Sequence, residues 1–208
     1  MTFVPNQIYH VYNQGNNRDK IFFQDRNYQF FLKKMEIHLA PYAEILAYCL
    51  MPNHFHWLIY TKPEGCELSN AVKPIPKMIS SVVEEPGYDP ENYFQQNLSH
   101  SIKTILSSYT RAVNKQEGRS GSLFRAKTKA KDGWIGAEIK VGEEGDELLF
   151  RANNQYANTC LQYIHNNPVK AELSRRTTDW EYSSARDFAG LRRSSILNQN
   201  MAKALLSA

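Results

Sequence analysis

The hydrophobic positions along the chain recur at two spacings, one typical of strands and the other of helices. Short apolar runs between turn-forming residues predict strands at Ile8–Asn13, Ala43–Leu50 and His54–Tyr60. Between the first two strands, apolar residues at helical spacing predict a helix with Asp25 as its N-cap and Pro41 as its stop signal. The N-terminal part of the chain is therefore predicted to run strand, helix, strand, strand.

The rest of the chain adds a helix, a strand and another helix. Apolar positions predict a second amphipathic helix from Ser99 to about Gly118, and Ser122–Lys131 is predicted as a fourth strand. A third helix is expected over 153–167. Pro168 should end it, because proline lacks the amide proton that the next helical turn needs.

This element order predicts an α+β fold. The order βαββαβ, followed by a C-terminal helix that carries a tyrosine, is typical of ferredoxin-like or RRM-like domains, in which an antiparallel sheet is backed by helices. We expect one sheet face to pack on the helices and the other to stay open. Irregular insertions at about 62–97 and 132–150 interrupt a single predicted domain over 1–190, and a tail over 191–208 follows it.

The composition is that of a globular protein. The 208 residues are 42% hydrophobic, which is enough for one well-formed core. No apolar run approaches the length of a membrane span, and the N-terminus does not resemble a signal peptide. Three widely spaced cysteines imply no disulfide framework, so a cytoplasmic location is expected. The net charge of +4 is too small to indicate a partner by itself.

Two histidines begin the third predicted strand. Side chains alternate along a strand, so His54 and His56 should project from one face while Phe55 and Trp57 pack the other. Two imidazoles side by side fit a divalent-metal site. Two polar residues with ordinary local hydrogen bonds would give the same pattern, and the spacing alone does not decide between these interpretations.

A basic stretch precedes the second predicted insertion. Between Lys103 and Lys131 the chain holds eight basic residues and one acid, and the last four basic residues alternate with small ones. On a strand this alternation would align the cations along one face, as a track for nucleic-acid phosphates requires, although lysines also protect exposed sheet edges. The candidate DNA-binding residues are Arg111, Lys115, Arg119, Arg125, Lys127, Lys129 and Lys131.

The third predicted helix has a polar side next to its apolar stripe. Tyr156, Cys160, Tyr163 and Asn167 share that side, and Tyr163 lies at its border with the apolar residues. Its phenol could emerge toward a site, with the amide of Asn167 pointing the same way. A core-edge tyrosine and a helix-capping asparagine would show the same pattern.

Five segments in this order resemble one family of enzymes. They are Tyr9–Arg18, Tyr48–His56, Tyr109–Lys127, Tyr163–Ala171 and Trp180–Ala185. Together they resemble the single-tyrosine HUH transposases of the IS200-like superfamily and, within them, the REP-associated tyrosine transposases. HUH denotes His-hydrophobe-His, which His54-Phe55-His56 matches.

The resemblance implies a transposase that cleaves and rejoins single-stranded DNA at hairpin (REP-like) sequences through a 5′-phosphotyrosine intermediate. By position, Tyr163 would be the nucleophile, and His54, His56 and Asn167 would hold Mg²⁺ or Mn²⁺. The implied partner is single-stranded or hairpin DNA, and the protein would act as a monomer or homodimer.

Two other functions fit parts of the sequence. A domesticated, non-catalytic module could bind hairpin or single-stranded nucleic acid through the basic stretch alone. A structural zinc site could use Cys49, His54, His56 and Cys66, but this set lacks the paired CxxC spacing of zinc modules. His165 lies two residues from Tyr163, off its helical face, and is interpreted as structural.

Overall fold

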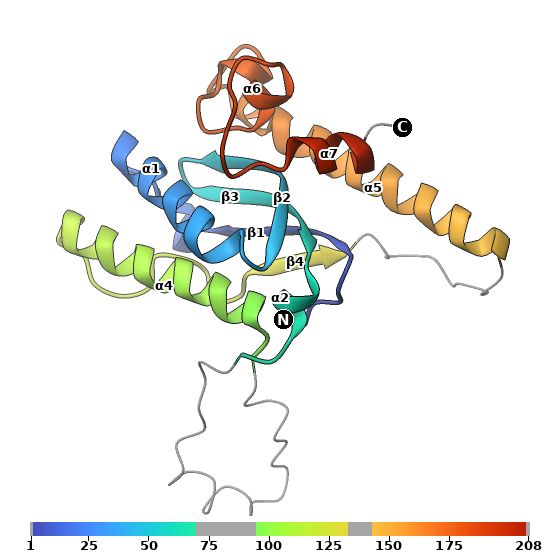
Figure 1. Ribbon diagram of the computed structural model, residues 1–208. Helices are drawn as coiled ribbons and strands as arrows, with labels where there is room; N and C mark the ends of the chain where they lie inside the picture. The colour runs from blue at the N-terminus through green and yellow to red at the C-terminus, as the bar shows by residue number, and fades with distance from the viewer. Residues whose placement is uncertain (1, 70–94, 133–142, 207–208) are drawn as a thin grey trace, which may run out of the picture.

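The computed structural model describes residues 2–69, 95–132 and 143–206, with only the backbone for residues 132 and 143–155. Within these ranges, four strands form one antiparallel sheet in the order β2-β3-β1-β4 (Figure 1). The strands are β1 (Ile8–Gln14), β2 (Ala43–Met51), β3 (His54–Thr61) and β4 (Lys129–Asp132). This arrangement confirms the predicted α+β fold and the βαββαβ order of its elements.

Two helices cover one face of the sheet. α1 (Asp25–Lys34) continues into a π-helical turn, η2 (Met35–Leu39), and α4 (Asn97–Glu117) lies beside them (Figure 1). Phe31 of α1 and Trp57 of β3 are fully buried in the core between these helices and the sheet, with ring centroids 5.8 Å apart. This core contains the apolar positions that predicted the helices.

The described residues also contain several other helical segments. No helix within the described residues is long and apolar enough to cross a membrane. The segments are η1 (Asn16–Arg18), α2 (Pro63–Cys66), α5 (Glu143–Lys170), η4 (Thr177–Asp179), α6 (Ala185–Phe188) and α7 (Gln199–Leu206).

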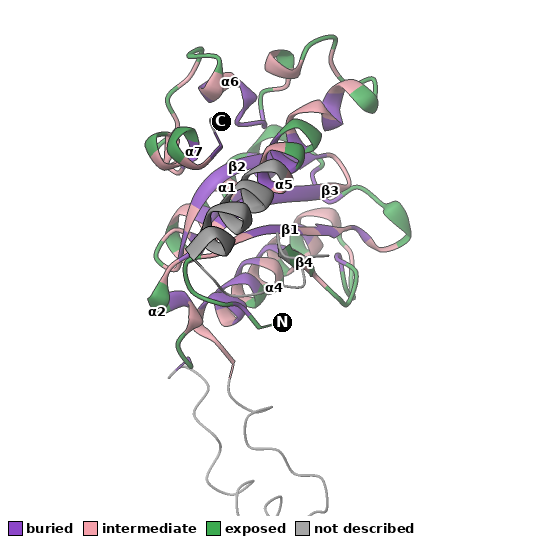
Figure 2. Ribbon diagram, turned by 90° about the vertical axis from the view of Figure 1, so that its right-hand side faces the viewer, coloured by how far each residue is buried: buried purple, intermediate pink, exposed green. Residues whose placement is uncertain are grey.

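α5 crosses the second face of the sheet (Figures 1 and 2). Ala157 and Ile164 are fully buried there in a second core with Leu58 of β3. The expectation that this face stays open is wrong, because the central strands carry apolar side chains on both faces. Leu58 and Trp57 are both buried on opposite faces, and each face therefore needs a cover.

A β-bulge sets which residues of β2 face α5. The register with β3 shifts between Ile45 and Ala47, so that Leu46 is the additional residue. Ile45 belongs to the first core, whereas Leu46 and Ala47 both belong to the second. The extra residue reverses the alternation, and Cys49 therefore lies on the α5 side, across from His56.

The predicted N-cap of α1 was wrong by one residue, whereas the predicted end of α4 was right. Gln24, not Asp25, is the N-cap of α1, and it forms a reciprocal capping box with Asn27. α4 does end at Gly118, which takes a left-handed conformation with a φ of 61°. Asp25 is the first residue of α1, and its carboxylate there still stabilises the positive N-terminal end of the helix.

The fourth strand is shorter than predicted. β4 begins at Lys129 rather than at Ser122. The residues before it meet the turn after β1 at a single bridge between Gly15 and Phe124, instead of a continuous ladder. Arg125 and Lys127 therefore lie ahead of the strand, and only Lys129 and Lys131 alternate on it.

α5 is longer than predicted at both ends. Residues 143–150, expected in a loop, belong to the helix, whereas 133–142, like 70–94 of the other predicted insertion, lie outside the described residues. Pro168 does not stop the helix, because in the last turn it forfeits only one hydrogen bond. Instead, Glu172 adopts a φ of 57°, and Leu173 N–H donates to the carbonyl of Pro168 at 2.9 Å, which closes the helix in a Schellman motif.

The segment after α5 is packed onto the sheet. Leu197 forms a bridge with Ile45 of β2, and α7 buries Ala202 and Leu206 against the second core. The expected tail over 191–208 is therefore, as far as Leu206, part of the packed structure. Its apolar residues cover the edge of the sheet that β2 forms.

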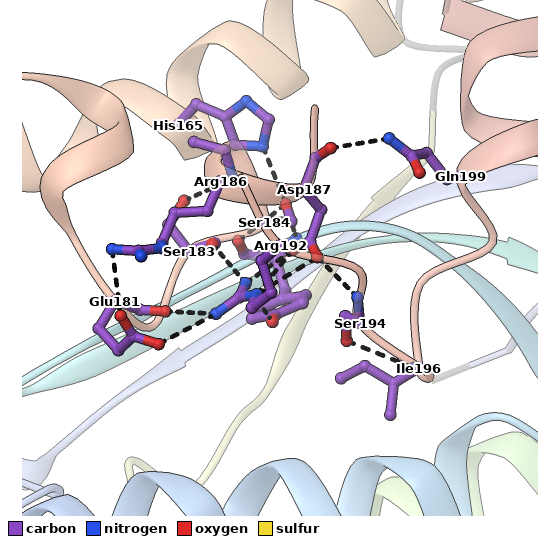
Figure 3. Close-up of polar contacts among 12 residues, drawn as sticks. His165, Glu181, Ser183, Ser184, Arg186, Asp187, Arg192, Ser194, Ile196 and Gln199 are labelled. Atoms are coloured by element: carbon purple, nitrogen blue, oxygen red, sulfur yellow. Dashed lines mark hydrogen bonds and ion pairs between the residues drawn. The ribbon is translucent and has the colours of Figure 1, made fainter. Parts of the chain in front are cut away.

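Arg192 holds this segment in place (Figure 3). Its guanidinium donates to the carboxylate of Asp187 at 2.6 Å, to the Tyr48 hydroxyl at 2.8 Å and to the carbonyls of Ser183 and Glu181. Asp187 is only 1% exposed. A carboxylate buried this deeply is tolerated only with a partner, so Arg192 is necessary for the C-terminal packing.

Replacing Arg192 by methionine should lower the free energy of unfolding by about 3–5 kcal/mol, because the buried carboxylate of Asp187 loses its counter-ion. The neighbouring Arg193 is exposed. Arg193→Met should therefore change stability by less than about 0.5 kcal/mol. Urea unfolding followed by circular dichroism measures both values. Equal losses in the two variants would contradict the role given to Arg192.

Candidate active site

A cavity of about 350 Å³ lies where the C-terminal part of α5 meets the sheet. Four separate parts of the chain form its walls: β1, the start of β3, the residues leading into β4, and α5. The lining residues are Tyr12, Asn13, Gln14, His54, His56, Arg125, Lys127, Lys129, Tyr163 and Asn167. The cavity thus collects the histidines, the tyrosine, the asparagine and three of the cations that the sequence singled out.

The two histidines lie on one face of β3, as their spacing predicted. Their ring centroids are 5.0 Å apart, while Phe55 and Trp57 are buried in the core on the opposite face. The backbone of β3 is paired on both sides, with β1 and β2. This central position in the sheet fixes the direction in which both imidazoles point.

His54 contacts an amide on each side. Its Nδ1 lies 2.6 Å from the Oδ1 of Asn53. Burial lowers the pKa of His54, and a hydrogen bond with Asn167 partly opposes this effect. The Nδ2 of Asn167 donates to the Tyr163 carbonyl at 2.9 Å. Because the bond between Asn167 and His54 favours the charged imidazole, the amide oxygen of Asn167 is the atom that accepts from the histidine.

His56 is the more deeply buried histidine of the pair. Its Nδ1 lies 2.9 Å from the Nε2 of His10, a residue of β1 that is itself 7% exposed. Burial lowers the pKa of His56 to about 2 and, together with the charge of Lys131, lowers that of His10 to about 4. Both imidazoles are therefore neutral at physiological pH, which is the form in which a histidine binds a metal.

Tyr163 lies over these rings at the mouth of the cavity. Its ring stands edge-on to His56, with centroids 5.3 Å apart, and 43% of the residue is exposed. The ammonium of Lys170, about two turns further along α5, lies 5.5 Å from the centroid of the tyrosine ring. The phenol is thus open to a ligand on one side and held between imidazoles and a cation on the other.

The structure divides the predicted basic residues into two groups. Arg125, Lys127 and Lys129 line the cavity. They also line, with Lys131, an adjoining groove of about 1030 Å³ between α4 and the segment 122–131. None of the described residues that line this groove is acidic. The cavity and the groove therefore share a positively charged wall.

The other three predicted cations lie elsewhere. Arg111, Lys115 and Arg119 line neither the cavity nor the groove. Arg111 is close enough to Lys34 of α1 to contribute to the lowered pKa of that lysine. Its side of α4 therefore faces α1, away from the cavity.

Sequence reasoning did not single out His10, Tyr12 or Lys170, which lie at the site. His10 and Tyr12 alternate on β1 as His54 and His56 do on β3, and this alternation was the available signal for His10. Lys170 follows Tyr163 by seven residues, a spacing that returns to the same side of a helix. Lys170 was not recognised as part of the site because the helix was expected to end at Pro168.

The donor atoms fit a divalent cation with neutral nitrogen and oxygen ligands. Two neutral imidazoles and one amide oxygen converge on the cavity. Among the described residues, no group of three or more histidine, cysteine, aspartate or glutamate side chains is placed to hold a metal. The amide of Asn167, which lines the cavity, is the third candidate donor. The zinc alternative is wrong, because Cys66 packs against the first core on the opposite face of the sheet from His54 and His56.

Comparisons with known proteins agree with this fold. Residues 3–101 match the model of the family described as "Transposase IS200 like". A solved structure, "Structure of the REP associates tyrosine transposase bound to a REP hairpin", is similar with a TM-score of 0.51 and 17% identity, over 93% of this chain and 86% of that chain. No curated protein matches. At this identity the structural likeness supports the fold, and the family match ends before α5.

The buried His10 predicts how stability depends on pH. Its pKa is about 4 in the folded protein against an ordinary value of 6.5 once the chain unfolds, so the folded state binds the proton less readily. Its contribution is therefore present above pH 6.5 and is lost as the pH falls toward 4, by up to roughly 3 kcal/mol. Urea unfolding over this range should show a steeper loss for the wild type than for His10→Gln, which has no proton to bind. Equal slopes would contradict the burial of a neutral His10.

Proposed function

We propose that this chain, whose residues 3–101 match the IS200-like transposase family, cleaves and rejoins single-stranded DNA with Tyr163 as its nucleophile. The observation that carries the proposal is the cavity in which Tyr163, His54, His56 and Asn167 come together beside three cations. The family match covers the two histidines but not the tyrosine. The role of Tyr163 therefore rests on the geometry of α5 over β3.

The residues around Tyr163 suit an attack on a phosphodiester. The phenol oxygen forms a bond to phosphorus, the bond from phosphorus to the 3′ oxygen breaks, and that oxygen leaves with a proton as a 3′-hydroxyl. The downstream strand stays attached through a 5′-phosphotyrosine. Because this ester retains the energy of the original bond, another 3′-hydroxyl can displace the tyrosine and rejoin DNA.

The metal would be held by His54, His56 and Asn167. When bound, Mg²⁺ or Mn²⁺ supplies positive charge that polarises the phosphate and stabilises the charge developing on its non-bridging oxygens. Neutral ligands leave the full charge of the ion available for this purpose. The chain's own residues would orient the phosphate, and Lys170 adds a second positive charge over the tyrosine ring.

The DNA strand would approach along the basic segment. Arg125, Lys127 and Lys129 line both the cavity and the groove beside it, so a strand that lies along them reaches the tyrosine without leaving positive potential. The similar solved structure contains a REP hairpin, and we extend hairpin DNA as a ligand to this chain. Cleavage by a monomer or by a homodimer is compatible with this path.

Tyr163→Phe tests the nucleophile. The variant keeps the ring that packs on His56 but lacks the attacking oxygen, so it should fold and bind Mn²⁺ and hairpin DNA yet form no covalent adduct and make no cut. Tyr156→Phe, on the same side of α5 but outside the cavity, is the matched control and should react normally. Denaturing gels of labelled hairpin DNA measure adduct and cut, and calorimetry measures Mn²⁺ binding.

Alanine at both His54 and His56 should give the complementary pattern, with Mn²⁺ binding and cleavage lost and most DNA binding retained. An adduct formed by Tyr163→Phe would move the nucleophile elsewhere. An upstream fragment that a polymerase cannot extend would reject the 5′-phosphotyrosine mechanism. Hairpin binding without any adduct in the wild type would instead favour the non-catalytic module.

Lys127→Ala with Lys129→Ala tests the DNA path. Loss of two phosphate contacts should make the slope of log affinity against log salt shallower by roughly 1.4, at about 0.7 per contact with single strands. Arg193→Ala with Lys203→Ala removes the same charge from the C-terminal segment, which packs at the opposite edge of the sheet from β4. The slope of log affinity against log salt for this second double variant should not change. Equal changes in the two double variants would mean that only net charge matters.

A further inference from the structure

A neutral imidazole carries its proton on one of two nitrogens, and only the other nitrogen can bind a metal. Which nitrogen is bare depends on the hydrogen bonds that the ring makes. For His54 the decisive neighbour is Asn53, which lies in the turn between β2 and β3. Its amide is placed between the histidine and the turn that follows β1.

The orientation of the Asn53 amide follows from its second partner. Its Nδ2 lies 3.1 Å from the carbonyl oxygen of Arg18. A carbonyl oxygen can only accept, so the nitrogen end of the amide must face Arg18 and the oxygen end must face His54. The Oδ1 of Asn53 is 2.6 Å from the Nδ1 of His54, and this short contact between two acceptors would be repulsive unless Nδ1 carries the proton.

The backbone of the turn holds the Arg18 carbonyl in this position. Asn17 and Arg18 both adopt left-handed conformations, with φ values of 52° and 62°, which is costly for residues other than glycine. Gly15 N–H donates to the carbonyl of Asn53 at 2.9 Å. A Cβ on Gly15 would lie 2.2 Å from the carbonyl oxygen of Asp19, so the tight turn requires glycine there.

We infer that Asn53 is a positioning residue that locks His54 as the Nδ1–H tautomer and leaves its Nε2 bare toward the cavity. The 2.6 Å contact with Asn53 favours this tautomer over the one in which Nε2–H donates to the amide oxygen of Asn167, whereas the benefit to metal binding rests on the proposed function. The Arg18 carbonyl orients the Asn53 amide, and the amide in turn orients the imidazole of His54. Partners of this kind orient metal-binding histidines and typically change metal affinity by about 10- to 100-fold.

His56 differs from His54 in this respect. Its Nδ1 faces the Nε2 of His10, and a proton between two imidazoles can belong to either ring. The bond therefore leaves two tautomers of His56 open, and a metal would select the one with Nδ1–H. Of the two histidines, His54 is the one whose tautomer is set before a metal binds.

The test is nitrogen NMR of the full-length protein without metal, at a pH where the histidines are neutral, which assigns the protonated nitrogen of His54 directly. The wild type should show protonated Nδ1 and bare Nε2, and Asn53→Ala a mixture. Asn53→Asp loses the bond to the Arg18 carbonyl but should keep the wild-type tautomer, because a carboxylate also accepts from Nδ1–H. Asn16→Ala is the matched control, since Asn16 lies in the same turn but donates to the Ser122 carbonyl.

Mn²⁺ affinity, measured by calorimetry, should fall about 10- to 100-fold in Asn53→Ala and stay near wild type in Asn53→Asp and Asn16→Ala. Protonated Nε2 in the wild type, or a pure Nδ1–H tautomer in Asn53→Ala, would overturn the inference. Wild-type protein that binds no Mn²⁺ but shows the expected tautomers would support the positioning role of Asn53 and reject the metal site, so the two failures are distinguishable.

Discussion

The packing of α5 on the sheet is the contact on which the candidate active site depends. Ala157, Leu161 and Ile164 must be buried, and the second face of the sheet offers the apolar surface that buries them. This requirement fixes the rotation of the helix about its axis. Tyr163 and Asn167, on the adjacent side of the helix, are thereby turned toward His54 and His56, and no contact among the four polar residues is needed to bring them together.

A second contact holds the helix from the side opposite the cavity. The Nε2 of His165 lies 2.8 Å from the hydroxyl oxygen of Ser184, which also accepts a hydrogen bond from the backbone N–H of Tyr48 (Figure 3). Burial lowers the pKa of His165 to about 4, so this histidine is neutral and structural, as its position off the Tyr163 face suggested. Because Ser184 belongs to the segment that Arg192 anchors, the C-terminal packing and the position of the tyrosine are connected through one side chain.

Much of this could be predicted from the sequence, because alternation and helical periodicity are local. The first three strands, the shared face of His54 and His56, and the polar side of α5 all follow from the spacing of residues. The length of α5 does not, because Pro168 signals an end that the Schellman motif at Glu172 overrides. The bulge at Leu46 and the closed second face depend on which strands become neighbours, and no single segment encodes this.

The residues that prepare the histidines were the hardest to find, for a physical reason. A metal ligand is conspicuous because few residue types can serve, whereas its supporting partner needs only one hydrogen-bonding atom at the correct place. Asn53 was visible as a turn former, and His10 as a polar residue in a strand. Their significance appears only when the turn after β1 and the strand β1 lie beside β3. Burial also determines the protonation state of the histidines. The same apolar packing that positions α5 excludes water from His10 and His56 and keeps them neutral, so one constraint provides both the geometry of the candidate site and the protonation state that the proposed metal binding requires.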